Sequence, residues 1–336
     1  MEFSDNDVLK IILVILFAII DCFSFCGNCI VIFVITSTRH LNLPQNYLIV
    51  SLAFVDLLLS VISMPLYINT SILNGKWILG FQLCRLFMLC DVTLSSASML
   101  NLCAISIDRY VALFYPFKYK FKRNSWIIGS LLLGSWFLSC LTSIPLLFLK
   151  RSELYHQSVK GEQFCIIPLN TIFITIALIL GYYVPVIILI YTNLCIYARL
   201  KHRKKKTVIN AAMTNKSTQI ECSASTYSGI NGSTGIDKIP SVIKKDGRLT
   251  LTLCGIVLSS IICWSPFFLL LTTSITMKNV IPFPEIVHEI SLWLGYLNSA
   301  INPIIYNFTN SDFKRRLRNI FRASKQNRIN TSIKGI

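Results

Sequence analysis

The chain has 336 residues, of which 54% are hydrophobic and 14% are charged, and its formal net charge is +17. A soluble domain usually carries about 25% charged residues, so this composition excludes an ordinary soluble protein. Basic loops beside an anionic membrane surface explain the positive charge, so we expect no nucleic acid among the partners.

Seven apolar stretches follow one another along the chain, and each is long enough to span a bilayer, which takes about 17 to 25 residues. They lie near residues 9–36, 45–71, 81–114, 126–149, 170–199, 248–275 and 286–307. Inside lipid such a stretch must be helical, because no water is present to satisfy a non-helical backbone. We therefore predict an all-α fold, a seven-transmembrane helix bundle.

The distribution of Lys and Arg between the stretches predicts an orientation. If the first residues lie outside, 25 of the 32 Lys and Arg residues lie on the inner side. Because basic loops stay on the cytoplasmic side, we expect the amino terminus outside and the carboxyl terminus inside. The expected plan is an extracellular amino terminus (1–8), a seven-transmembrane domain (9–307), a membrane-surface helix (308–322) and a cytoplasmic tail (323–336).

Two polar segments have distinct patterns. Residues 201–247 begin with a basic run and show no apolar periodicity, which predicts a disordered cytoplasmic loop. Near the carboxyl end, Phe313, Leu317, Ile320 and Phe321 fall on one face of a helix. That pattern is typical of an amphipathic helix lying on the inner membrane surface, in contact with lipid.

A carboxylate and an Asp-Arg pair stand out in the third apolar stretch. Asp91 precedes Arg109 by 18 residues, or five helical turns, so the two lie on one helix face roughly 27 Å apart. Because an ionisable residue inside a span is costly, Asp91 is a candidate ligand-binding group. The alternative is a structural carboxylate that accepts hydrogen bonds from neighbouring hydroxyls, such as that of Tyr296.

Aromatic residues and a further carboxylate occur in other stretches. Trp264, Phe267 and Phe268 lie at positions i, i+3 and i+4, so their rings share one helix face. Such a stripe either packs in the core or lines a pocket for a cation and an aromatic ring. Asp21, in the first stretch, faces the bundle, and three roles stay open: ligand contact, proton binding or pairing with a hydroxyl.

Most of the 12 cysteines lie inside the apolar stretches, where a free thiol behaves as a small apolar side chain. Cys84 and Cys165 differ, because both are expected on the outer side of the membrane. That side is oxidising, so we predict a disulfide between them.

Motifs in every stretch resemble those of the rhodopsin-like (class A) G-protein-coupled receptors. In chain order they are Gly27-Asn28, Leu52-Ala53-Phe54-Val55-Asp56, Cys84, Asp108-Arg109-Tyr110, Trp136, Pro185, Cys263-Trp264-Ser265-Pro266 and Asn302-Pro303-Ile304-Ile305-Tyr306. Within this class the chain looks like a biogenic amine receptor. Asp91 lies seven residues after Cys84, Phe267-Phe268 follow Trp264-Ser265-Pro266, and Trp293 and Tyr296 occur in the last stretch.

The resemblance implies three groups of site residues. The expected ligand-binding residues are Asp91, Ser95, Trp264, Phe267, Phe268, Trp293 and Tyr296. The expected switch and G-protein-coupling residues are Asp108, Arg109, Tyr110, Asp246, Pro266, Asn302, Pro303 and Tyr306. A candidate sodium site comprises Asp56, Ser98, Asn298 and Asn302, which alternatively form a plain hydrogen-bonded network; no other cofactor is expected.

The resemblance also implies the ligand and the partners. We expect a plasma-membrane receptor with a small amine agonist, a heterotrimeric G protein, arrestin and receptor kinases as partners. Ala177, Leu178 and Gly181 stand where catecholamine receptors carry serines. A non-catechol amine, such as a serotonin-, tryptamine- or phenylethylamine-like compound, is therefore favoured.

Two expected switch positions depart from the pattern of the family. Ser260 replaces the usual Phe one turn before Trp264, and Asn193 replaces the usual Tyr in the fifth stretch. Either high basal activity or weak coupling is expected from these replacements.

Other classes of function fit the sequence less well. No nucleophile, base and orienting group fall at usable spacing for an enzyme, and Tyr296 stands where an opsin would carry its retinal-binding Lys. A transporter would show internal repeats with interrupted spans in matching positions, and the sequence shows none. The nearest alternative is an orphan, peptide or lipid receptor of the same fold with high basal activity.

Overall fold

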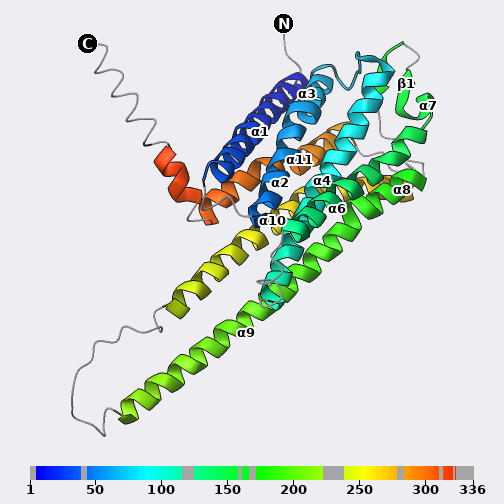
Figure 1. Cartoon of the computed structure of the whole chain (residues 1–336). Coiled ribbons are helices and arrows are strands. Elements are labelled where there is room, and N and C mark those ends of the chain that lie inside the picture. Colours follow the sequence, from blue (N-terminus) through cyan, green and yellow to red (C-terminus); the bar gives the residue numbers. More distant parts are fainter. Residues whose placement is uncertain are drawn as a thin grey trace, which may run out of the picture.

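Seven long helical segments pack side by side in the structure (Figure 1). The structure is a computed structural model, and it describes residues 5–38, 44–115, 125–157, 161–165, 172–221, 238–277, 284–309, 313–320 and 322. Five segments are single helices, namely α1 (Asp5–Thr36), α4 (Gly80–Phe114), α6 (Ser125–Ser143), α10 (Lys238–Thr276) and α11 (Glu285–Thr309). These segments, with the two described next, form the predicted all-α seven-helix bundle.

The second and fifth segments each contain a π-helical turn. The second comprises α2 (Tyr47–Leu58), the π turn η2 (Leu59–Ser63) and α3 (Met64–Ile72), and the fifth comprises α8 (Ile172–Leu178), the π turn η4 (Ile179–Tyr183) and α9 (Val184–Glu221). The extra residue of a π turn rotates everything beyond it relative to a regular helix. Short elements complete the chain: the 3-10 turns η1 (Pro44–Asn46) and η3 (Ile144–Phe148), the short helix α7 (Arg151–Leu154), and the strands β1 (Tyr155–Gln157) and β2 (Gln163–Cys165).

Large apolar side chains cover the outside of the bundle. Phe23, Leu133 and Ile262 are among the exposed ones. A continuous apolar exterior of this size indicates contact with lipid rather than water. In the described part of the chain, six helices are long and apolar enough to cross a membrane; α11 is less apolar because it contains Asn298, Ser299 and Asn302.

Buried polar contacts connect neighbouring helices at several depths. The Trp136 indole of α6 donates a hydrogen bond to Ser51 Oγ of α2 at 3.1 Å. Thr93 of α4 donates to Ser143 Oγ of α6 at 2.7 Å. Because an unmet polar group is costly in lipid, such bonds fix which helix faces meet.

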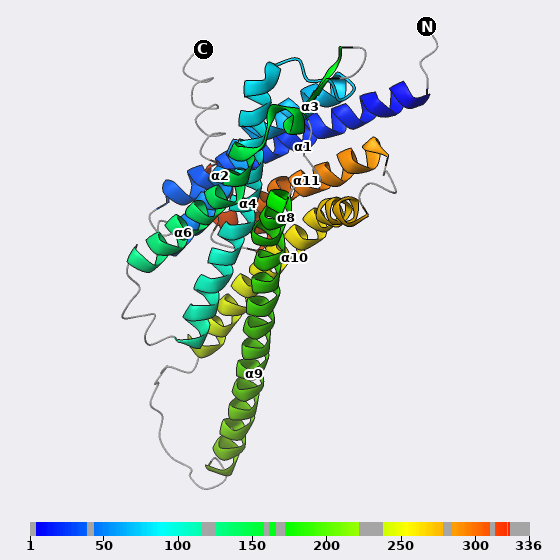
Figure 2. The same ribbon diagram turned by 90° about the vertical axis from the view of Figure 1, so that its right-hand side faces the viewer.

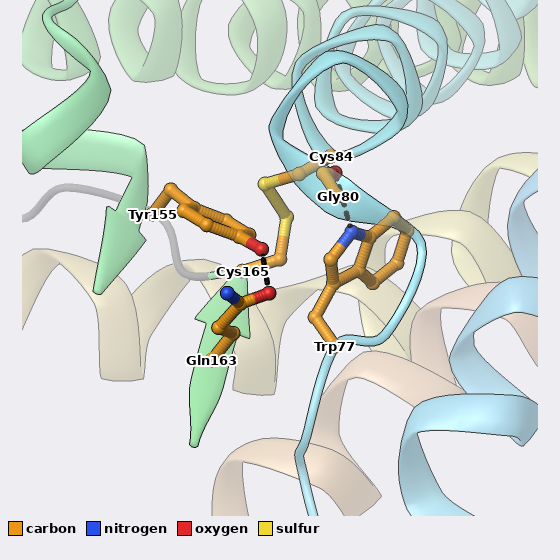
Figure 3. Close-up of a disulfide and its surroundings, with 6 residues drawn as sticks. All are labelled: Trp77, Gly80, Cys84, Tyr155, Gln163 and Cys165. Atoms are coloured by element: carbon orange, nitrogen blue, oxygen red, sulfur yellow. Dashed lines mark hydrogen bonds between the residues drawn. A yellow bond between two sulfur atoms is a disulfide. The ribbon is translucent and has the colours of Figure 1, made fainter. Parts of the chain in front are cut away.

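A small hairpin covers one end of the bundle and is joined to α4 by a disulfide (Figure 3). β1 and β2 pair antiparallel, with Tyr155 opposite Cys165. The disulfide connects Cys165 to Cys84, whose Cα atoms are 5.8 Å apart, so the predicted pairing is confirmed. Trp77 packs beside this bridge, and its indole nitrogen donates to the Gly80 carbonyl oxygen at 2.8 Å.

The opposite end of the bundle differs from the prediction. We expected residues 201–247 to be disordered, but α9 continues to Glu221 and α10 begins at Lys238, so both helices extend well past the bundle (Figures 1 and 2). A helix that already exists in the membrane needs no new nucleus, and Lys, Ala and Gln extend it at little cost. Residues 222–237 lie outside the described part of the chain.

The expected membrane-surface helix is present over residues 313–320. Phe313 is buried in the main core, and Leu317 and Ile320 pack against the same cluster. Phe321, which we expected on this face, lies outside the described residues.

Candidate functional site

Asp91 lies on the inner face of α4 and is almost fully buried. The hydroxyl of Tyr296, on α11, donates a hydrogen bond to Asp91 Oδ1 at 2.5 Å. An ionised carboxylate offers about four acceptor positions, so this bond leaves room for further donors. Asp91 therefore does accept a hydrogen bond from a neighbouring hydroxyl, as the alternative interpretation expected. This bond does not prevent a ligand from binding the same carboxylate.

Three aromatic side chains of α10 face the same region. The Trp264 ring lies 6.1 Å from that of Tyr296 and 5.6 Å from that of Phe268, and Phe267 lies 5.4 Å from Phe268. Gly295 of α11 permits this packing, because a Cβ atom there would lie 2.5 Å from Trp264 Cε3. The indole nitrogen of Trp264 is buried and has no hydrogen-bond partner among the described residues.

Ser95 follows Asp91 by one helical turn on the same face of α4. Its hydroxyl is buried and has no partner in the described part of the chain. Buried polar atoms are usually hydrogen-bonded, so Ser95 Oγ and Trp264 Nε1 are two unmet groups near the predicted depth of a ligand.

Trp293 connects the site to α1. Its ring stacks on Phe17 of α1 at 4.2 Å and meets the Tyr296 ring edge-on at 5.4 Å. Phe17 was not predicted as a site residue. Its spacing of four residues from Asp21 was the available signal, because it puts both side chains on one face of α1.

Two tyrosines of the fifth segment also belong to the site and were missed. Tyr182 stacks on Phe268 at 4.0 Å, and its hydroxyl shares a 2.9 Å hydrogen bond with Ser265 of α10. The Tyr183 hydroxyl shares a 2.7 Å bond with Thr272, also on α10. Both tyrosines lie in the π turn η4, whose rotation could not be inferred from an apolar sequence.

The fifth segment has no serine at the positions where catecholamine receptors carry them, and a hydroxyl from another helix lies beside one of these positions. A Cβ atom at Gly181 would lie 2.8 Å from Ser96 Oγ, so the hydroxyl of Ser96, on α4, occupies the space beside this glycine. Thr142 of α6 donates to Ser96 Oγ at 3.0 Å. Hydroxyls are therefore present near this end of the site, but they come from α4 and α6.

Tyr67 and Phe87 extend the aromatic wall toward the hairpin end. The Tyr67 ring lies 5.6 Å from that of Tyr296 and 4.8 Å from that of Phe87. Neither residue was predicted. Phe87 precedes Asp91 by one turn, and this spacing could have found it.

A second polar cluster surrounds Asp56 deeper in the bundle. Asp56 Oδ1 accepts hydrogen bonds from Ser299 at 2.8 Å and Ser98 at 3.3 Å, and Oδ2 accepts one from Asn302 at 2.8 Å. Asn298, which we expected here, instead accepts a hydrogen bond from Ser260 at 2.8 Å through its Oδ1. Adjacent helical residues point about 100° apart, so Ser299 reaches Asp56 and Asn298 does not.

This cluster fits a sodium ion by its chemistry. Asp56, Ser98 and Ser299 contribute carboxylate and hydroxyl oxygens, and Asn302 Oδ1 is a buried oxygen with no hydrogen-bond partner among the described residues. Hard cations prefer oxygen ligands of this kind. Asn298 Oδ1 accepts a hydrogen bond from the Ser260 hydroxyl, and its role as a sodium ligand stays a prediction.

The Asp-Arg-Tyr run lies near the opposite end of α4. Arg109 Nε is 3.8 Å from Asp108 Oδ2, and Tyr110 stacks on Phe114 at 4.4 Å. Asp246 lies in α10, but its side chain is outside the described part of the chain, so its expected contact with Arg109 stays a prediction. Of the other expected switch residues, Pro266 and Pro303 lie inside α10 and α11, and Tyr306 is buried.

The two departures from the family pattern both make contacts between helices. Ser260 connects α10 to Asn298 of α11, as described above. Asn193 Nδ2, on α9, donates to Ser106 Oγ of α4 at 3.3 Å. Polar bonds therefore replace the aromatic packing that Phe and Tyr would provide at these positions.

Comparison with known proteins agrees with this geometry. Residues 27–306 match the family described as 7 transmembrane receptor (rhodopsin family). The chain belongs to this family, and within it to the biogenic amine receptors; it is a receptor and not an enzyme.

Three relatives illustrate the similarity. Octopamine receptor beta-2R of Drosophila melanogaster is 31% identical over 314 residues, which cover 88% of this chain and 58% of the relative. 5-hydroxytryptamine receptor 7 of Xenopus laevis is 29% identical over 96% of this chain and 79% of its own length. 5-hydroxytryptamine receptor 1B of Homo sapiens is 30% identical over 93% of this chain and 86% of its own length.

Proposed function

We propose that this receptor binds a small biogenic amine whose ammonium group pairs with Asp91. The observation that carries the proposal is a buried carboxylate with acceptor capacity left, facing a wall of aromatic rings. Ammonium groups are attracted both to a carboxylate and to aromatic faces. In a site with little water the ion pair is strong, because its field is screened weakly.

The ligand we propose is a non-catechol amine, of the serotonin, tryptamine or phenylethylamine type. Ala177 and Gly181 provide no hydroxyl from the fifth segment, and the Tyr182 hydroxyl is engaged with Ser265. Ser96, supported by Thr142, is the hydroxyl nearest Gly181. Ser96 and Thr142 are bonded to each other, so a ring with one polar substituent suits them better than the two adjacent hydroxyls of a catechol.

In the proposed mechanism the agonist shifts the populations of two receptor states. It can do so only through a difference in its affinity for them, and Trp264 is the element that contacts both the ligand region and α11. The signal then passes along α10 and α4 to Asp108, Arg109 and Tyr110. Pro266 and Pro303 interrupt the hydrogen-bond ladders of α10 and α11, and those points accommodate bending.

The proposed setting is the plasma membrane, with the amino terminus outside. A heterotrimeric G protein then meets the end of the bundle that carries Arg109, beyond which α9 and α10 extend. Arrestin and receptor kinases are proposed as further partners on that side, and membrane lipids as partners of the apolar exterior.

The test is a panel of amines applied to cells that express the full chain with a G-protein activation reporter. The panel contains octopamine, 5-hydroxytryptamine, tryptamine, phenylethylamine and dopamine. We expect a non-catechol amine to activate at lower concentration than dopamine. Silence toward every amine, with a high basal signal, would instead support an orphan, peptide or lipid receptor of the same fold.

We further propose that the Asp56 cluster binds sodium, and a stability measurement tests this. Sodium that binds only the folded protein raises its unfolding temperature by mass action. Purified receptor should unfold at a higher temperature in sodium chloride than in potassium chloride of equal ionic strength, and Asp56→Asn should lose this difference. Asp91→Asn is the control and should keep it; equal sodium responses in wild type and Asp56→Asn would contradict the site.

A further inference from the structure

Asp21 is a carboxylate near the middle of α1 that the amine site described above does not use. It is the one charged residue between positions 11 and 38. Its Oδ1 atom is buried and has no hydrogen-bond partner among the described residues. An ionisable group at such a depth is costly and normally has a partner, so this one calls for an explanation.

Asp21 lies where α1 packs against α11, a line of contact called the seam below. The two helices make tight contacts before and after Asp21 along this seam. One turn toward the hairpin end, Phe17 stacks on Trp293 at 4.2 Å. On the other side, Asn28 Nδ2 donates to the Ser299 carbonyl oxygen at 3.1 Å, and a Cβ atom at Gly27 would lie 2.8 Å from Pro303 Cγ. Between these two tight contacts the seam holds unmet polar atoms.

A second unmet group lies at the hairpin end of the seam. Trp293 is almost fully buried, and its indole nitrogen has no hydrogen-bond acceptor in the described part of the chain. Trp293 and Asp21 both neighbour Phe17, the first by stacking and the second by one helical turn. The two unmet groups are not bonded to each other.

In the described part of the chain, the elements that pack most extensively against α1 supply no Lys or Arg for Asp21. They are α2, η2, α3 and α11. Residues 47–72 contain no basic side chain, and α11 contains only His288, which precedes Trp293 by more than one turn toward the end of the helix. Among the described residues, these elements therefore offer Asp21 no Lys or Arg partner.

We propose that Asp21 binds a second ammonium group, so that the receptor takes a diamine with one nitrogen on Asp91 and the other on Asp21. This inference rests on the proposed amine site. A chain of aromatic rings leads from Asp91 to Phe17, one turn from Asp21, because Tyr296 bonds Asp91 and contacts Trp293, and Trp293 stacks on Phe17. Such rings suit the apolar chain between two amino groups.

The chemistry of the seam favours an ammonium over a metal cation. A sodium or calcium ion needs several oxygen ligands, and Asp21 supplies one carboxylate. An ammonium carries its own N–H donors, and a single carboxylate satisfies it through a charge-assisted hydrogen bond.

The experiment compares α,ω-diaminoalkanes with n-alkylamines of the same chain length, and uses tryptamine as a monoamine reference. Binding is measured by the shift in unfolding temperature of the full-length receptor in lipid nanodiscs and by competition. In the wild type we expect one range of chain lengths in which the diamine binds at least about tenfold more tightly than the monoamine. Asp21→Asn should abolish that preference and leave tryptamine binding unchanged.

The unliganded proteins provide a second readout. Asp21→Asn removes an unpaired charge and should unfold at the same or a higher temperature than the wild type, so a smaller diamine effect cannot be ascribed to misfolding. Asp21→Leu repeats the test without any polar group. Cys22→Ser, at the neighbouring exposed position, is the matched control and should keep the diamine preference.

Three outcomes would overturn the inference. They are a wild type with no diamine preference at any chain length, a preference that Asp21→Asn retains, and a stabilisation that sodium chloride alone produces through Asp21. Failure of the amine site itself has another signature, because tryptamine would then not bind the wild type and Asp91→Asn would change nothing.

Discussion

Asp91→Asn is expected to reduce the potency of every activating amine by at least about 100-fold. The substitution leaves a ligand ammonium buried without its counter-ion, and breaking such a pair costs roughly 3–5 kcal/mol. Each 1.4 kcal/mol corresponds to about a factor of ten in affinity. The measurement is the amine concentration for half-maximal G-protein activation, at matched surface expression.

Asparagine keeps the shape of the side chain and an oxygen that can accept the Tyr296 hydrogen bond, so the fold should be retained. Tyr296→Phe is the matched control, because it removes the hydroxyl that donates to Asp91 and leaves the charge. We expect it to change potency by no more than about tenfold, because the charge that pairs with the ammonium is retained. Equal potency in wild type and Asp91→Asn would refute the ammonium contact.

The fold could be predicted largely from the sequence, because a membrane permits few structures. An apolar run of sufficient length must be a helix in lipid, so the seven spans followed from hydropathy alone. Outside the lipid this constraint ends, and the continuation of α9 to Glu221 was missed for that reason. The π turns at Leu59–Ser63 and Ile179–Tyr183 were also missed, because their residues are apolar like their neighbours.

The site could be predicted at the level of motifs but not of individual contacts. Asp91 and Tyr296 were identified together, since a carboxylate in a span needs a donor. Which residue of α11 faces Asp56 depends on how the helix is rotated about its axis. A shift by one residue turns the side chain by about 100°, and a motif does not specify that rotation. Asn298 was therefore assigned to Asp56, whereas the structure gives that contact to Ser299 and bonds Asn298 to Ser260.

Gly295 shows how strongly one missing side chain determines the position of Trp264. A Cβ atom at Gly295 would lie 2.5 Å from Trp264 Cε3 and 2.6 Å from Cζ3. The indole is rigid and is surrounded by Phe267, Phe268 and Tyr296, so it cannot move away without displacing other rings. Gly295→Ala is therefore expected to destabilise the receptor by about 1–3 kcal/mol, the usual cost of overpacking a core.

Because Trp264 connects the ligand region to α11, its displacement should also change signalling. We expect Gly295→Ala to weaken amine potency and to alter basal G-protein activation, measured beside the unfolding temperature in nanodiscs. Gly255→Ala is the matched control, since a Cβ atom there would meet Ile305 Cγ2 at 3.7 Å, an ordinary contact. In a helix Ala is more favourable than Gly by up to about 1 kcal/mol, so the control should be neutral or stabilising. If both variants unfold at the wild-type temperature with unchanged potency, the position of Trp264 does not depend on Gly295.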